Sequence, residues 1–112
     1  MKDVIIIGGG AAGIFCALSV IENSKEAVNV TILERLERIG KKILATGNGK
    51  CNFTNKNLVP KKYNNPKFVT STLSTYGYKE IIKYFESIGL LSKEISEGRM
   101  YPYTESATTV LE

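Results

Sequence analysis

Residues 4–13 read VIIIGGGAAG, an apolar, β-branched run that passes directly into a glycine-rich turn. The apolar run is typical of a strand buried on both faces of a parallel sheet. The glycines match the pattern G-x-G-x-x-G at Gly8, Gly10 and Gly13. In this pattern the first glycine allows a tight turn, the second lets the backbone approach a pyrophosphate, and the third lets helix and strand pack closely. The stretch therefore predicts a nucleotide-binding turn between a strand and a helix.

The flanking residues complete a βαβ unit of ordinary size. Asp3–Ile7 is the expected first strand, and Val28–Leu33 is a second run rich in β-branched residues. Between them, residues 11–23 have helical periodicity, and we expect Cys16 to be buried on that helix. The apolar residues that recur at helical spacing are Ile14, Phe15, Leu18 and Ile21.

An acidic residue stands where the second strand ends. Glu34 follows Gly13 by 21 residues, which is the place of the carboxylate that accepts a hydrogen bond from a ribose hydroxyl. A carboxylate there repels a 2′-phosphate, so NADP is disfavoured, whereas FAD and NAD both keep a free ribose diol. The alternative is a tight β–α turn without a ligand, in which Glu34 is an ordinary surface residue.

Residues 35–57 show no clear period and contain several glycines, lysines and asparagines. We expect an ordered loop with a helical turn near Lys41–Leu44, because long irregular loops in compact domains are often functional. The loop is not a P-loop, since Leu44 and Cys51 stand where that motif needs Gly and Ser or Thr. Gly47 and Gly49 could still help form an anion-binding nest; the alternative is a solvated basic loop.

The remainder is predicted to be largely helical. Asn65 caps a helix over residues 66–76, and a second helix over residues 78–88 ends at Gly89. A strand or hairpin follows over residues 94–103, and a last helix starts near residues 104–106. The apolar stripe expected in the core of this region is Ile81, Ile82, Phe85 and Ile88.

Composition narrows the chemistry. The chain has no His, which excludes imidazole-ligated zinc and a Ser–His pair within it. Its two cysteines, without a CxxC, indicate an intracellular protein, and Cys51 is expected to pack rather than to act as a catalytic thiol. The stretch from Arg38 to Lys79, both included, contains nine basic residues and no acidic one. This block favours anionic partners, although Lys56, Lys61, Lys62 and Lys67 are interpreted as a solvated face.

Three segments carry a family resemblance: residues 4–13 with Leu33-Glu34, residues 40–55 (GKKILATGNGKCNFTN), and residues 98–102 (GRMYP). Together they resemble the BaiN-like, aminoacetone-oxidase-type family of FAD-dependent, NAD(P)-linked oxidoreductases. The resemblance implies an α/β, Rossmann-like, two-dinucleotide-type flavoprotein fold. Because members of the family are much longer, it also implies that residues 1–112 are an N-terminal part of the FAD-binding domain.

In that interpretation residues 1–34 are the βαβ unit, 35–57 the cofactor loop, and 58–112 a helical segment that starts the next elements. The 112-residue chain alone is then expected to be inactive and to expose apolar surface. The cofactor-binding residues implied by the resemblance are Gly8, Gly10, Ala11, Ala12, Gly13, Glu34, Arg35, Lys42, Gly47, Asn48, Gly49, Cys51 and Asn52.

Asn48 and Lys50 depart from the Gly and Arg of many members, and a lysine cannot offer a bidentate phosphate contact. Arg99, Tyr101 and Tyr103 could meet the flavin or a substrate, but an aromatic hairpin edge is the favoured interpretation.

The expected protein is a cytoplasmic flavoprotein with FAD, NAD(P)H as electron donor, a small-molecule substrate and no metal. We expect no membrane partner, regard nucleic acid as unlikely, and expect further polypeptide to complete the fold. The catalytic residues are unknown. The alternatives are an NAD-linked dehydrogenase module and a flavoprotein that acts on RNA.

Overall fold

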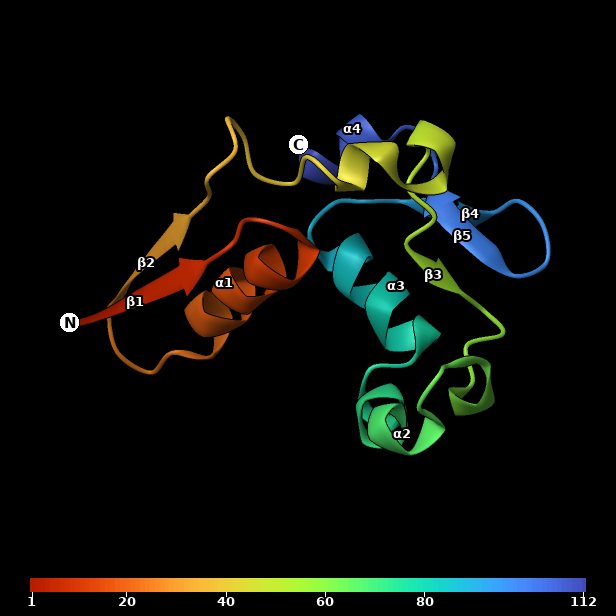
Figure 1. Ribbon diagram of the computed structural model, residues 1–112, viewed down its shortest axis with the longest axis horizontal. Coiled ribbons are helices and arrows are strands. Elements are labelled where there is room, and N and C mark those ends of the chain that lie inside the picture. Colours follow the sequence, from red (N-terminus) through yellow and green to blue (C-terminus); the bar gives the residue numbers. More distant parts are fainter. The chain divides into compact units, whose positions relative to one another are not determined.

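The computed structural model describes every residue, Met1–Glu112, and the chain forms two compact units. The first unit is Met1–Leu44 and the second is Ala45–Glu112. The boundary lies within the loop over residues 35–57. Figure 1 traces both units along the chain.

The first unit is a βαβ unit, as predicted. It contains β1 (Lys2–Ile7), α1 (Ala11–Asn23) and β2 (Val28–Leu33). The two strands pair in parallel, with α1 beside them (Figure 1). The Gly8 N–H donates to the Leu33 carbonyl oxygen at 2.8 Å, so the ladder extends into the glycine turn.

The glycine turn needs its glycines for reasons that the structure shows directly. Gly8 has a φ of +100°, a left-handed conformation that side chains disfavour. A Cβ at Gly13 would lie 1.9 Å from the Gly8 carbonyl oxygen. The first turn of α1 therefore packs against the backbone that leaves β1, as the third glycine of the pattern predicts.

Burial of the first unit differs from the expectation. Ile5 and Ile7 are 65% and 88% exposed, so β1 is not buried on both faces. Side chains alternate across a strand, and α1 packs against one face of β1 and β2, while Ile5 and Ile7 on the opposite face of β1 stay exposed. Cys16 is exposed rather than buried as expected; the buried residue of α1 is its neighbour Ala17, which points in a different direction because consecutive residues of an α-helix are about 100° apart around the axis.

The second unit joins short elements around a small sheet. Its strands are β3 (Thr54–Asn55), β4 (Ser92–Glu94) and β5 (Arg99–Pro102), paired antiparallel in the order β3-β5-β4. Its α-helices are α2 (Pro66–Thr75), α3 (Tyr78–Ser87) and α4 (Ala107–Leu111). The 3₁₀ segments are η1 (Ile43–Gly49), which spans the unit boundary, and η2 (Pro60–Lys62).

The helix ends follow the sequence signals. The Asn65 side chain accepts a hydrogen bond from the Phe68 N–H at 3.2 Å, so it caps α2 as predicted. Gly89 has a φ of +96° just after α3, and the Leu90 N–H donates to the Phe85 carbonyl oxygen at 2.9 Å. This is the glycine-terminated helix end that the sequence predicts.

The core of the second unit is centred on Phe85. Its ring lies 4.7 Å from that of Phe53, centroid to centroid, and both Leu90 and Met100 are buried. Ile88 was expected in the same stripe, but it is 51% exposed because α3 already ends at Ser87. No helix of either unit has the length and apolar character needed to cross a membrane.

The contact between Gly13 and Gly8 yields a stability prediction. Gly13→Ala should lower the free energy of unfolding by about 1–3 kcal/mol, because the new methyl group overlaps the Gly8 carbonyl oxygen. Urea denaturation followed by circular dichroism measures the loss. Gly10→Ala is the matched control, since a Cβ there meets nothing within 4 Å. Equal losses for the two variants would contradict the packing argument.

Candidate functional site

The N-terminus of α1 presents backbone donors without acceptors. The first hydrogen bond that closes the helix runs from the Ile14 N–H to the Gly10 carbonyl oxygen at 3.0 Å. The N–H groups of Ala11, Ala12 and Gly13 therefore find no acceptor in the protein, and Gly10 supplies no side-chain cap. Such donors at the positive end of the helix dipole suit an anion.

Gly10 is open in a way that its neighbours are not. A Cβ at Gly9 or Gly13 would collide with this chain, whereas a Cβ at Gly10 would meet no atom within 4 Å. Gly10 also lacks a positive φ. Neither packing nor backbone conformation explains a glycine at this position, and the open α-carbon leaves room for a ligand to approach the helix N-terminus.

The Glu34 carboxylate forms hydrogen bonds with the backbone of the same turn. One carboxylate oxygen accepts from the Gly9 N–H at 2.9 Å and the other from the Leu36 N–H at 2.9 Å. The Leu36 and Gly9 hydrogen bonds, aided by the Arg35 charge, hold the pKa of Glu34 below its usual range. Each carboxylate oxygen retains a second lone pair, so this geometry is compatible with a ribose hydroxyl as a further partner.

The two basic residues expected near the cofactor differ in their surroundings. Arg35 is the second residue after β2 and acts on Glu34 through its charge. Lys42 is exposed and makes no ion pair, whereas its neighbour Lys41 pairs with Glu37 at 3.1 Å. Of the two neighbouring lysines, Lys42 is thus the one whose charge is not engaged by an ion pair.

The other predicted cofactor residues lie in the second unit, in a loop of left-handed backbone. Gly47, Asn48 and Cys51 have φ values of 54°, 54° and 57°, and Gly49 has 82°. The N–H of Lys50 donates to the Gly47 carbonyl oxygen, and the N–H of Cys51 to that of Thr46. These two N–H groups are therefore used within the loop and are not available to an anion.

Asn52 ties this loop to the sheet. With its amide nitrogen facing the carbonyls, it donates to Met100 at 3.2 Å and to Thr54 at 3.1 Å. A Cβ at Gly47 would lie 2.5 Å from the backbone nitrogen of Asn52 and 3.2 Å from the ring of Tyr101. Gly47 is therefore required for close packing of the loop, besides any role toward a cofactor.

Cys51 is an inert thiol in this setting. It is 5% exposed, and burial raises the pKa of its thiol, while a hydrogen bond with the Thr46 side chain opposes the rise. A buried thiol that resists ionisation is a poor nucleophile. The structure agrees with the interpretation of Cys51 as a packing residue.

Lys50 and Lys56 have no acidic residue near them in the sequence, yet both form ion pairs in the structure. Glu105 contacts Lys93 at 2.9 Å and Lys50 at 3.2 Å, and these charges hold its pKa below the usual range. Lys56 pairs with Glu94 at 2.6 Å, so it is not simply part of a solvated face as expected. The partners of Lys50 and Lys56 lie far away along the chain, and no sequence pattern marks them.

Two of the segments that carry the family resemblance meet in the second unit. Thr54 and Asn55 of β3 pair with Met100 and Arg99 of β5. The side-chain amide of Asn55 donates to the Glu97 carbonyl oxygen at 3.3 Å. A Cβ at Gly98 would lie 2.6 Å from the side-chain oxygen of Asn55. Arg99 pairs with Glu97 across the turn. Residues 98–102 therefore belong to a hairpin with β4, as favoured, but β5 pairs with β3 on its other side and is the central strand of the sheet, so the expectation of an edge strand is wrong.

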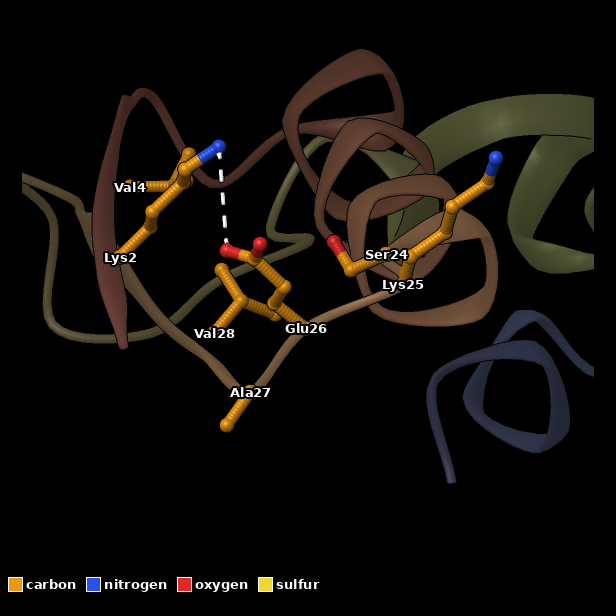
Figure 2. A pocket seen from close by; sticks show the side chains of 7 residues that line it. All are labelled: Lys2, Val4, Ser24, Lys25, Glu26, Ala27 and Val28. Carbon is orange, nitrogen blue, oxygen red and sulfur yellow. Dashed lines mark ion pairs between the residues drawn. The ribbon is translucent and has the colours of Figure 1, made fainter.

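A surface hollow lies at the other end of the parallel strands (Figure 2). Lys2 and Glu26 face each other across it at 4.0 Å, and residues 24–28 form one side. Ligands of open parallel sheets bind outside the carboxyl ends of the strands, whereas this hollow is at the amino ends. It is therefore not the nucleotide site. The chain also has no cluster of three or more side chains that could hold a metal ion.

Comparison with known proteins agrees with this geometry. A family model described as HI0933-like protein Rossmann domain matches residues 2–112. A 3-dehydro-bile acid delta(4,6)-reductase of Clostridium scindens is 44% identical over 114 residues, which is 100% of this chain and 27% of that protein. This match and the family model together bear out the resemblance described above.

Ribosomal RNA dihydrouridine synthases are also similar. That of Haemophilus influenzae is 38% identical over 102 residues, covering 89% of this chain and 25% of the relative. That of Escherichia coli is 34% identical over 101 residues, covering 88% and 24%. The chain thus spans about a quarter of the length of these curated relatives.

The two cysteines provide an internal comparison of reactivity. Cys16 is exposed and Cys51 is buried with a raised thiol pKa, so iodoacetamide should modify Cys16 at least about tenfold faster at pH 8. Mass spectrometry of the peptides that contain each cysteine measures both rates in one sample. Equal rates in the folded protein would show that Cys51 is accessible and reactive.

Glu34 makes stability depend on pH. Its folded-state pKa is lowered, so its contribution is present above the unfolded value of about 4.3 and is lost as pH falls through the folded value. Glu34→Gln should therefore be less stable than the wild type at pH 7, and the difference should shrink below about pH 4. Denaturation midpoints measured from pH 7 to pH 3 test this, and a constant difference would contradict it.

Proposed function

This chain belongs to the HI0933-like protein Rossmann domain family, and on that basis we propose that its first unit binds the ADP portion of FAD in a flavin-dependent oxidoreductase. The observation that carries the proposal is the open α-carbon of Gly10 beside the unsatisfied N–H groups of Ala11, Ala12 and Gly13. A pyrophosphate fits this combination, because it needs both donors and close backbone approach.

Each residue of the first unit has a distinct task in this proposal. The N–H groups at the start of α1 receive the phosphates, and the Glu34 carboxylate accepts from the ribose. Lys42 adds positive charge without an ion pair to compete for it. The bound flavin supplies the electron transfer of the reaction, while the protein supplies binding and orientation.

The choice of FAD over NAD rests on the family and on a relative. The glycine turn and Glu34 suit either dinucleotide, but the segments over residues 40–55 and 98–102 resemble those of FAD-dependent oxidoreductases. The Clostridium scindens relative is named a reductase. We therefore place the chain in a cytoplasmic FAD-dependent enzyme that takes electrons from NAD(P)H, acts on a small-molecule substrate and includes further polypeptide.

RNA is a second candidate for the substrate of the same enzyme. Two relatives carry the name ribosomal RNA dihydrouridine synthase. In this chain, part of the acid-free basic block makes no ion pair, which leaves its charge available to phosphates. The unpaired basic residues of the block are Arg38, Lys42, Lys61, Lys62, Lys67 and Lys79.

Gly10→Ala tests the cofactor site. In the full-length polypeptide that carries this segment, the variant should bind FAD about tenfold more weakly or worse, because the methyl group occupies the approach to the helix N-terminus. Quenching of flavin fluorescence on binding measures the affinity. Parallel titrations with NAD and NADP distinguish a dehydrogenase module from a flavoprotein. Unchanged FAD affinity in Gly10→Ala would place the pyrophosphate elsewhere.

The RNA alternative has a separate test. If the basic block contacts RNA, Lys61→Gln/Lys62→Gln should weaken binding of a ribosomal RNA fragment and reduce the slope of log affinity against log salt by about 1–2. Filter binding at several salt concentrations measures both quantities. Lys56→Gln is the matched control, because that lysine is engaged by Glu94. If RNA binding neither depends on salt nor changes in the Lys61→Gln/Lys62→Gln variant, the small-molecule substrate is favoured.

A further inference from the structure

Gly9 occupies a position that the pattern G-x-G-x-x-G leaves unspecified, and it is contacted by three residues: Glu34, Ile39 and Gly40. Its N–H donates to Glu34 at 2.9 Å, and its carbonyl oxygen accepts from the Gly40 N–H at 2.7 Å. A Cβ at Gly9 would lie 2.5 Å from Cγ2 of Ile39 and 3.3 Å from Cβ of Glu34. All four contacts come from the segment that follows β2.

The segment over residues 34–40 is shaped to make these contacts. Gly40 is buried and has a φ of +68°, and its carbonyl oxygen accepts from the Ile43 N–H at 2.9 Å. The Leu36 N–H fixes the second oxygen of Glu34. The segment thus leaves β2, crosses over Gly9 and turns away at Gly40.

Three consecutive glycines make such a restraint useful. Gly8, Gly9 and Gly10 have more backbone freedom than any other tripeptide, so ordering them costs more conformational entropy. The arrangement in the structure presents the N–H groups of α1 beside the open Gly10. A turn that is already ordered loses less entropy when a ligand binds, which strengthens binding without adding a contact to the ligand.

We propose that the segment Glu34–Gly40 is a strap that holds the glycine turn in its nucleotide-receiving shape, with Ile39 and Gly40 as positioning residues. The proposal rests on the proposed function, since it assumes that the turn receives a nucleotide. It assigns Glu34 a second task besides the ribose: its carboxylate keeps the Gly9 N–H oriented. In this proposal Ile39 and Gly40 act on the nucleotide through their contacts with Gly9.

A double-mutant cycle between positions 9 and 39 tests the strap. In the full-length polypeptide, Gly9→Ala should weaken FAD binding by about tenfold, because the methyl group displaces the strap. Gly9 lacks a positive φ, so backbone strain does not contribute. Adding Ile39→Ala removes the 2.5 Å overlap with Cγ2 but keeps the Cβ of position 39 at 3.0 Å, so the double variant should bind FAD more tightly than Gly9→Ala and more weakly than the wild type. Absence of recovery, with both variants folded, would overturn the proposal.

Hydrogen exchange without ligand provides a second readout that does not depend on FAD binding. Ile39→Ala should accelerate exchange of the Gly9 and Gly40 amides several-fold, since their hydrogen bonds lose their cover. Ile21→Ala, another exposed isoleucine, is the matched control. Unchanged exchange would refute the strap even if FAD binds. Conversely, faster exchange in a protein that takes up no FAD would retain the strap and reject the proposed cofactor.

Discussion

The approach of α1 to the backbone that leaves β1 is the constraint on which the first unit depends. A Cβ added at position 13 would lie 1.9 Å from the Gly8 carbonyl oxygen, so any side chain there would push α1 away from the backbone that leaves β1. Close packing keeps the N-terminus of α1 at the carboxyl end of the parallel strands. The three unsatisfied N–H groups and the open Gly10 are then in one place, which is the arrangement on which the proposed nucleotide site depends.

Glu34 connects this packing to recognition. It stands where β2 ends, so its backbone position is fixed by the parallel ladder, and its carboxylate reaches back to the Gly9 N–H. The same group that would select a free ribose diol therefore also orders the turn. In the proposed site, one side chain would serve both recognition and preorganisation, and the lowered pKa of Glu34 reflects the backbone hydrogen bonds that its carboxylate accepts.

The second unit solves a different problem, which is how to order a glycine- and asparagine-rich loop. Antiparallel pairing of β3 with β5 anchors one end of the loop, and Asn52 adds hydrogen bonds to Thr54 and Met100. Glu105 then pairs with both Lys50 and Lys93. These pairs are exposed, so we regard them as selecting a loop conformation rather than as a large source of stability.

Local signals in the sequence by themselves determined the βαβ unit, the cap at Asn65, the helix end at Gly89 and the place of Glu34, because each depends on residues close together in the chain. Only the tertiary structure decided the exposure of Ile7, the partners of Lys50 and Lys56, the pairing of β3 with β5, and the cover that Ile39 places over Gly9. Each of these depends on atoms brought together from distant positions, or on whether any element covers a face, and such relations leave no periodic or local mark in a sequence.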